Sequence, residues 1–185
     1  LAKDITPSRL QKAKFKVLDI LERSREAQTA LIVFAGEAFV VSPLTEDAHT
    51  IANLVPQLMP ALMPTQGSQV NLALDKAGEL FEQSGFKNGE IILLTDGMAF
   101  PELCYRTAAA LKAKSIRLSV LAVGTETGSP IPLDGGGFLK DASGAIVIPK
   151  LDQTEMRTLA QKGGGRIALL SHDDKDINFI LADDG

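Results

Sequence analysis

The sequence has little from which a redox site or a membrane span could be built. Cys104 is the only cysteine among 185 residues, so the chain cannot form an internal disulfide. It lies among apolar residues of a predicted helix, and we expect it to be a small buried side chain rather than a reactive thiol. No apolar run approaches the roughly 20 residues that a membrane-spanning helix needs. No charged-then-apolar leader opens the chain, and we expect no membrane contact by it.

The sequence also has no excess of basic residues. The chain has 19 Lys and Arg against 23 Asp and Glu, a formal net charge of -4, and no basic cluster interleaved with aromatic residues. We therefore expect no nucleic-acid partner. His49 and His172, the two histidines, lie far apart without cysteines or paired carboxylates at ligand spacing. This favours surface or capping roles for them over a metal centre.

Length and composition are those of an ordinary globular chain. Hydrophobic residues make up 45% and charged residues 23% of the sequence, which is typical of a folded domain. We expect one domain over residues 1–185. Because the first residue is Leu1 rather than Met, we expect the sequence to be a fragment of a longer protein.

Hydrophobic periodicity predicts alternating helices and strands. Thr6 as a cap and Pro7 in the first turn mark the start of the first helix, and Thr45 is the expected cap of the second. A glycine run at 163–165 follows a helix, so we interpret it as a helix stop rather than a phosphate-binding loop. Helices are expected over residues 7–25, 46–58, 70–83, 101–114, 153–162 and 174–181. Strands are expected over residues 29–34, 38–42, 90–95, 116–123 and 166–170.

This alternation predicts an α/β fold with a doubly wound, mostly parallel, Rossmann-like sheet flanked by helices. The tight turn before residues 38–42 predicts one antiparallel edge strand, and residues 90–95 are predicted to be central. Residues 125–152 are rich in Gly and Pro, and we expect an inserted β-hairpin there, 138–140 against 146–148. Ligand sites of such sheets lie at the carboxyl ends of the strands. The residues just past those ends are Gly36, Asp96, Gly97, Gly124 and Ser171.

Two polar residues stand out as candidates for chemistry. Asp96 leaves an all-apolar strand and needs a partner, which could be a cation, a metal ion or backbone donors; capping of the next helix or turn is an equal alternative. Ser68 follows Gly67 at the start of a helix, where its hydroxyl could ligate a hard cation. A simple helix cap is the alternative that Ser68 by itself favours.

These residues together resemble the von Willebrand factor A-type domains. The resemblance rests on Thr95-Asp96-Gly97 after an apolar strand, Gly67-Ser68 opening a helix, and Phe34-Ala35-Gly36 before the next strand. Within the family, Pro7-Ser8-Arg9-Leu10, Ser42-Pro43-Leu44-Thr45 and the insert resemble the bacterial BatA-like and BatB-like aerotolerance proteins. The resemblance spans nearly the whole chain.

The resemblance implies a metal-ion-dependent adhesion site, in which Asp96 and Ser68 would be metal ligands and Ser68 stands where the family usually has Thr. Oxygen ligands suit Mg²⁺, Mn²⁺ or Ca²⁺. The family's D-x-S-x-S motif and its strand are absent from this sequence, and their place would be just before Leu1. We therefore expect weak or no metal binding by this fragment. The strands beside the missing one would expose unpaired edges, so re-pairing, entry of another segment, or a homodimer with strand exchange is expected.

The resemblance favours a protein-interaction module over an enzyme. In the intact protein the metal would help to bind an acidic group of a partner protein, among which other Bat-type proteins are candidates. It also implies a periplasmic domain of an inner-membrane-anchored protein. Two alternatives stay open: a hydrolase or phosphotransfer enzyme with Asp96 as nucleophile, and a structural domain with a vestigial metal site.

Overall fold

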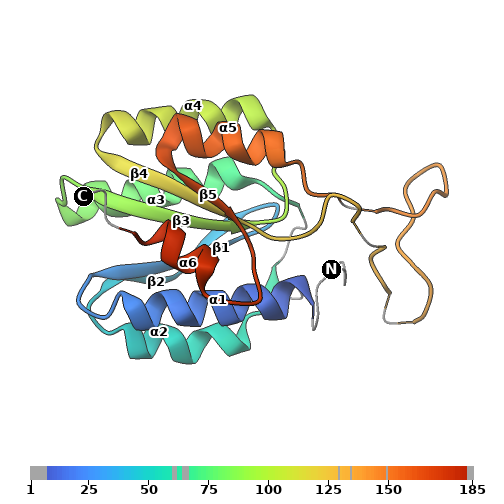
Figure 1. Cartoon of the computed structure of the whole chain (residues 1–185), viewed down its shortest axis with the longest axis horizontal. Helices are drawn as coiled ribbons and strands as arrows, with labels where there is room; N and C mark the ends of the chain where they lie inside the picture. Colours follow the sequence, from blue (N-terminus) through green and yellow to red (C-terminus); the bar gives the residue numbers. More distant parts are fainter. Residues whose placement is uncertain are drawn as a thin grey trace.

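A computed structural model of the chain describes residues 8–59, 62–63, 67–128, 130–133, 135–148 and 150–182. It confirms the predicted α/β architecture (Figure 1). The strands are β1 (Thr29–Phe34), β2 (Ala38–Thr45), β3 (Gly89–Thr95), β4 (Ile116–Ala122) and β5 (Gly164–Leu169). The helices are α1 (Arg9–Arg23), α2 (Ala48–Leu54), α3 (Val70–Ser84), α4 (Pro101–Ala113), α5 (Gln153–Gly163) and α6 (Lys175–Ile180), with a 3₁₀ turn, η1 (Val55–Gln57), after α2.

Local chemistry sets the helix boundaries. The cap of α1 is Ser8, whose hydroxyl oxygen accepts the Gln11 N–H at 3.2 Å; the predicted Thr6 and Pro7 start lies outside the described residues. The prediction of a helix over 46–58 capped by Thr45 is wrong at both ends. Asp47 caps α2 by accepting the Thr50 N–H, and Pro56, which has no N–H to donate, leaves only a 3₁₀ turn after Leu54.

The strands form two hydrogen-bonded sheets. β1 and β2 pair antiparallel across their tight turn, as predicted. β3, β4 and β5 pair in parallel in that order. Among the described residues β3 therefore has a strand partner on one side only, and the prediction that residues 90–95 form a central strand is wrong for this sheet. β4 holds the central place.

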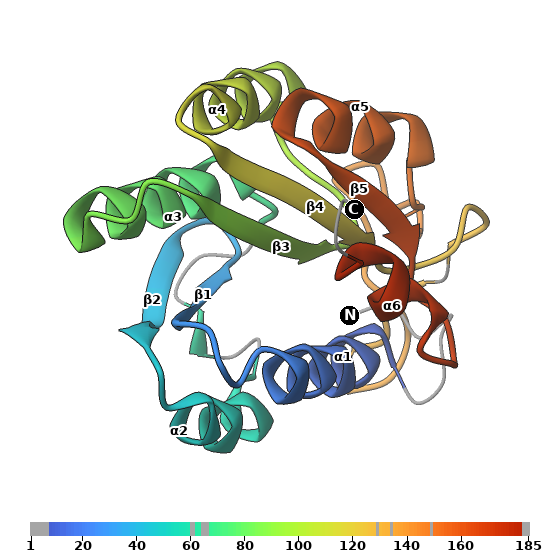
Figure 2. The same ribbon diagram turned by 60° about the vertical axis from the view of Figure 1, so that its left-hand side comes forward.

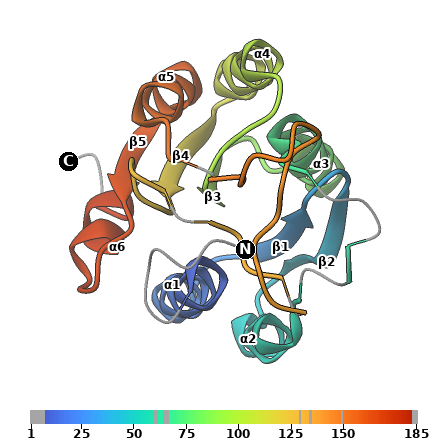
Figure 3. The ribbon, with the colours of Figure 1, turned by 90° about the vertical axis from the view of Figure 1, so that its right-hand side faces the viewer.

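The helices cover both faces of the strands, as a doubly wound fold requires. α3, α4 and α5 lie on one face, and α1, α2 and α6 lie on the other (Figure 3). The main core lies between β4 and the helices α3, α4 and α5. Fully buried side chains there include Leu118, Val120, Met156 and Leu159. Cys104 belongs to the same core, which confirms its predicted burial.

The end of α5 shows why three glycines stand in a row. Gly164 takes the left-handed conformation, φ +72°, that ends the helix, which confirms the interpretation as a helix stop. A Cβ on Gly163 would lie 2.5 Å from the Leu118 Cβ, and one on Gly165 would lie 2.2 Å from the Leu118 carbonyl oxygen. The glycines therefore allow α5 and β5 to approach β4 closely.

The insert departs from the predicted hairpin in detail. Lys140 and Ile146 form an antiparallel bridge, and the Val147 N–H donates to the Leu139 carbonyl, so the two limbs pair as predicted. A further bridge joins Pro132 to Phe138. These are isolated bridges rather than continuous strands. The insert projects from the body (Figure 1), and isolated bridges gain little from packing there.

The apolar side of α1 is less buried than its periodicity predicts. Five apolar residues recur at helical spacing along α1. Leu21 is buried, whereas the other four are only half-buried: Leu10, Ala13, Val17 and Ile20. The other buried residues of α1 are basic: Arg9, Lys14 and Lys16. Helix α1 is therefore held to the body in a way that hydrophobic periodicity does not reveal.

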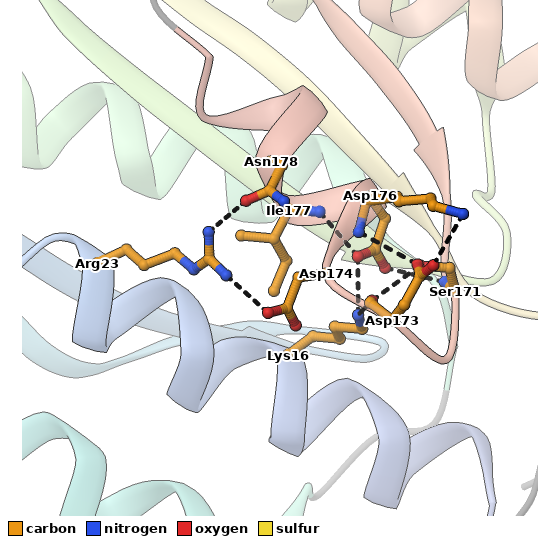
Figure 4. A network of polar contacts seen from close by, with 9 residues as sticks. Lys16, Arg23, Ser171, Asp173, Asp174, Asp176, Ile177 and Asn178 are labelled. Atoms are coloured by element: carbon orange, nitrogen blue, oxygen red, sulfur yellow. Dashed lines mark hydrogen bonds and ion pairs between the residues drawn. The ribbon is translucent and has the colours of Figure 1, made fainter.

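Lys16 shows how one of these buried charges is satisfied. Its Nζ lies 2.7 Å from Asp176 Oδ1 in an ion pair whose side chains are 4% and 1% exposed (Figure 4). The same Nζ also donates to the Asp173 carbonyl. The other carboxylate oxygen of Asp176 accepts the Ser171 N–H at 2.9 Å. This network fastens α1 to α6 and to the loop after β5.

The network holds its carboxylates in the charged form. Burial acts to raise the pKa of Asp176, but hydrogen bonds from Lys16 and from backbone N–H groups outweigh it, and the pKa lies below its ordinary value. Hydrogen bonds from the Ser171 side chain and the Lys175 N–H lower the pKa of Asp173 to about 2. The stability that these carboxylates contribute is therefore complete above their ordinary pKa and is lost as the pH falls through the lowered values.

Replacing Asp176 with Asn should lower the free energy of unfolding by about 3 kcal/mol at neutral pH, because the buried Lys16 loses its counter-charge. The difference from the unmodified chain should shrink as the pH falls from the ordinary pKa of Asp176 through its lowered folded-state value, where the native wild-type carboxylate also becomes protonated. Chemical denaturation across this pH range measures both. Asp174→Asn, at an exposed pair with Arg23, is the control and should cost less than 1 kcal/mol. Equal losses in the two variants would contradict the role of the buried pair.

Candidate functional site

The loops at the carboxyl ends of β1, β3 and β4 meet at one edge of the fold. The Gln69 N–H donates to the Ala35 carbonyl, and the Ala99 N–H donates to the Ser68 carbonyl, both at 2.8 Å. The Val123 N–H donates to the Thr95 carbonyl. Backbone hydrogen bonds thus join the loop after β1, the loop before α3 and the loop after β3, as expected for strand ends that point the same way.

Glycines allow two of these loops to approach closely. A Cβ on Gly67 would lie 3.2 Å from the Gly36 Cα, and the backbone of Gly67 has φ +150°. Ser68 is therefore held directly beside the end of β1. Of the other residues predicted just past strand ends, Ser171 instead belongs to the network around Asp176.

Asp96 has a cationic partner that the sequence analysis did not identify. Arg9 Nη1 lies 3.0 Å from Asp96 Oδ2. The Asp96 side chain is 33% exposed, whereas the Arg9 side chain is only 3% exposed. The alternative that Asp96 caps the next helix is wrong, because Phe100 occupies the cap position of α4 and makes no side-chain cap. Of the partners considered for Asp96, the described structure provides a cation.

Ser68 uses its backbone rather than its hydroxyl to join the site. Its carbonyl accepts the Val70 and Ala99 N–H groups. The cap position of α3 is Gln69, without a side-chain hydrogen bond, so the helix-cap alternative for Ser68 is wrong. The structure therefore brings the loops of Ser68 and Asp96 together, and in the described part of the chain it shows no hydrogen bond between the two side chains.

One signal in the sequence could have identified Arg9. It is the first residue of α1, and the first turn of that helix has no acidic residue. A cation is unfavourable at the positive end of a helix dipole, so an arginine there needs an anion from elsewhere. The pairing joins residues 87 positions apart, and local patterns do not predict which anion it is.

The described residues do not fit a hard cation by themselves. Such ions prefer six or more oxygen ligands, and this edge offers the Asp96 carboxylate and the Ser68 hydroxyl. No group of three or more His, Cys, Asp and Glu residues that could hold a metal ion occurs in the part of the chain that the structure describes. Moreover, a guanidinium already contacts Asp96. Whether Ser68 and Asp96 are metal ligands stays a prediction.

Phe100 lies four residues after Asp96 and is unusual in two respects. Its side chain is 62% exposed, and its backbone has φ +52° in the left-handed region. Non-glycine residues rarely adopt this conformation, and such strain is often found at functional sites. The Phe100 carbonyl accepts the Leu103 and Cys104 N–H groups, so the strained backbone starts α4 and leaves the aromatic ring pointing into solvent.

Comparison with known proteins identifies similar sequences and structures. Residues 1–98 match the model of the von Willebrand factor type A domain. An aerotolerance-related membrane protein from Bacteroides fragilis, solved with multiple mutations to serine, superposes with a TM-score of 0.86 at 29% identity over 93% of this chain and 86% of that one. BatB from Bacteroides thetaiotaomicron, a conserved hypothetical protein, gives 0.86 at 31% identity over 94% of this chain and 85% of that one.

A more distant structure supports the fold alone. Proximal thread matrix protein 1 from the mussel byssus, solved with a zinc-occupied metal-ion-dependent adhesion site, has a TM-score of 0.62 at 19% identity over 91% of this chain and 38% of that one. No curated protein sequence matches this chain. The metal described for the mussel protein therefore bears on that protein.

Replacing Phe100 with Asn should raise the free energy of unfolding by about 1 kcal/mol, because Asn tolerates the left-handed conformation and is a good cap residue. Little burial is lost, since the ring is mostly exposed. Thermal or chemical denaturation measures the change. Phe86→Asn is the matched control, because Phe86 is 48% exposed and has no positive φ; it should change stability by less than about 0.5 kcal/mol. A clear loss of stability in the Phe100 variant alone would contradict the assignment of strain.

Proposed function

Since the chain belongs to the von Willebrand factor type A domain family, we propose that it is a protein-interaction module of a bacterial envelope protein. The partner binds at the edge where β1, β3 and β4 end, around Asp96, Ser68 and Phe100. Such domains generally serve as interaction modules, and loops at strand ends are where binding residues gather on a rigid scaffold.

The exposed and strained Phe100, four residues after Asp96, is the observation that carries this proposal. A protein gains no stability from an aromatic ring in solvent on a left-handed backbone, and Asn or Gly would suit that position better. Aromatic residues are frequent anchors of protein interfaces. Leu103, one turn further along α4, is also exposed, at 42%. Exposed apolar side chains that follow a carboxylate closely in the sequence suit a protein partner.

The setting of the proposal comes from the relatives. One is described as an aerotolerance-related membrane protein and another as BatB. None of the described helices is both long and apolar enough to cross a membrane. We place the domain on the periplasmic side of the inner membrane, anchored through other parts of a longer protein, with other Bat-type proteins as candidate partners.

A metal-dependent grip on an acidic partner side chain is the finer form of this proposal. It assigns Ser68 and Asp96 as ligands of Mg²⁺, Mn²⁺ or Ca²⁺ and needs D-x-S-x-S, which is absent from this sequence. Because the described residues do not fit a hard cation by themselves, the proposal here rests on the surface and not on a bound ion.

An enzymatic role for Asp96 has less support. A nucleophilic carboxylate in phosphoryl or acyl transfer works with a general acid or base nearby. In the described part of the chain the hydrogen-bond and ion-pair partner of Asp96 is Arg9, which stays protonated and cannot serve as a base. The proposed function in protein interaction needs no general acid or base.

The proposal is tested with the periplasmic domains of other Bat-type proteins from the same genome as immobilised probes. The chain should bind at least one of them, and Phe100→Asn should weaken binding about tenfold or more, as loss of an aromatic anchor does. Phe86→Asn should leave binding unchanged. Equal binding by the Phe100 variant would exclude this surface. Phosphatase or esterase turnover that disappears in Asp96→Asn would instead support the enzymatic reading.

We also propose that an additional strand fills the interval between β1 and β3. Figure 2 shows the two strands as neighbours that are not joined into one sheet. Both end at the same set of loops, so one strand could pair in parallel with each. Every residue of β1 is only half-buried although all but Thr29 are apolar, whereas β4 is almost wholly buried. Unpaired edges and uncovered apolar residues both favour strand addition.

For this chain a second copy is the proposed source of the strand. The accessible surface of 10231 Å² exceeds the roughly 8,600 Å² expected for a folded chain of this mass. Light scattering at several concentrations should show a dimer, and a chain extended ahead of Leu1 by a strand carrying D-x-S-x-S should be monomeric. A monomer without the extension would count against exchange between copies.

A further inference from the structure

Arg9 brings a buried positive charge to the carboxylate around which the family's metal site would form. We infer that Arg9 is the resident cation of this site: its guanidinium neutralises Asp96 and opposes the binding of a divalent ion at the same carboxylate. This goes beyond the proposed interaction surface, and it assigns a role to a residue that the sequence analysis left without one.

The geometry distinguishes this pair from a surface salt bridge. The Nη1 to Oδ2 distance is 3.0 Å, and the guanidinium side is nearly inaccessible to solvent while Asp96 is one-third exposed. Arg9 therefore approaches Asp96 from inside the fold, and the carboxylate keeps an outer side toward solvent. A buried guanidinium keeps its charge, so it needs the anion that Asp96 supplies.

The loop after β4 is shaped around the same guanidinium. A Cβ on Gly124 would lie 2.9 Å from the Arg9 Cζ and 3.0 Å from its Nη2, and Gly124 has φ +126°. Any other residue there would be strained and would collide with Arg9. Three separate segments, α1, the loop after β3 and the loop after β4, thus converge on one planar cation, so its position is built into the fold.

The consequence concerns any cation that approaches Asp96. A divalent ion bound to this carboxylate would lie close to the guanidinium, and like charges at such distances repel strongly where water is scarce. The ion and Arg9 would also compete for the same Asp96 carboxylate. A divalent ion can therefore bind Asp96 firmly only when Arg9 withdraws, and the sequence sets this barrier in addition to the small number of oxygen ligands.

The test uses Mn²⁺ alone as the probe, on the chain of residues 1–185. Calorimetry gives its affinity, and paramagnetic broadening of the Gly97 and Ala99 amide signals shows whether it binds at Asp96. Arg9→Met should raise Mn²⁺ affinity at this place about tenfold or more, and Asp96→Asn added to it should abolish the gain. Arg25→Gln, which removes an exposed positive charge beyond the end of α1, should change nothing at Gly97.

Two further variants keep the test decisive if Arg9→Met folds poorly. Arg9→Lys retains the charge and should not gain Mn²⁺ affinity, so it is the control for altered packing. Asp96→Asn alone should lower the melting temperature because Arg9 stays buried with one anion fewer, and combining it with Arg9→Met should recover part of that loss. Equal Mn²⁺ affinity in the wild-type and Arg9→Met chains, or broadening that persists without Asp96, would overturn the inference. Neither result depends on a partner protein.

Discussion

The described strands β1 and β3 form no backbone hydrogen bonds with each other, and much of the packing in this molecule depends on that gap in the sheet. Each strand pairs on one side only among the described residues, so the strands form two sheets rather than one. A paired central strand such as β4 is buried by helices on both faces. At the interval between the sheets, in contrast, the apolar residues of β1 and most of those on the apolar side of α1 are only half-buried. Less hydrophobic burial is therefore available there to hold the layers together.

Charged groups of α1 take over part of that task. Arg9 contacts Asp96 in the loop after β3, Lys14 donates to the Pro56 carbonyl after α2, and Lys16 pairs with Asp176 of α6. Pro56 belongs to the half of the fold that contains β1 and β2, and the other two partners belong to the half that contains β3, β4 and β5. Hydrogen bonds to charged groups contribute about 1.5–3 kcal/mol each. Helix α1 thus connects the two sheets, which no strand pairing joins in the part of the chain that the structure describes.

The sequence predicts those parts that depend on local patterns. The run over 29–34 is confirmed to the residue, because a short apolar and partly β-branched segment before a tight turn has few alternatives. The helix over 70–83 differs from α3 by one residue. The prediction of a helix over 46–58 is wrong because Pro56 interrupts it. That prediction gives the periodic pattern more weight than the proline. Residues just past the strand ends were the right place to look for a site, since the topology rule needs only the order of elements.

The basic residues of α1 could not be placed in this way. Periodicity treats Lys and Arg as solvent-facing, whereas Arg9, Lys14 and Lys16 are buried through partners that lie 42 to 160 positions away in the sequence. The need of Asp96 for a counter-charge was evident from its position after an apolar strand, but its partner depends on how α1 packs. Long-range pairing of charges is a property of the assembled fold.

Because it attaches α1 to the loop after β3, the ion pair of Arg9 and Asp96 contributes to stability and also lies where a partner is proposed to bind. The Asp96 side chain is one-third exposed, and it lies on the surface proposed for a partner, four residues before the strained Phe100. A ligand that binds the Asp96 carboxylate would compete with Arg9 and so weaken one of the charged attachments of α1. The remaining attachments, at Lys14, Lys16 and Arg23, lie further along the helix. Binding at this edge therefore acts first on the amino end of α1, where apolar packing contributes least.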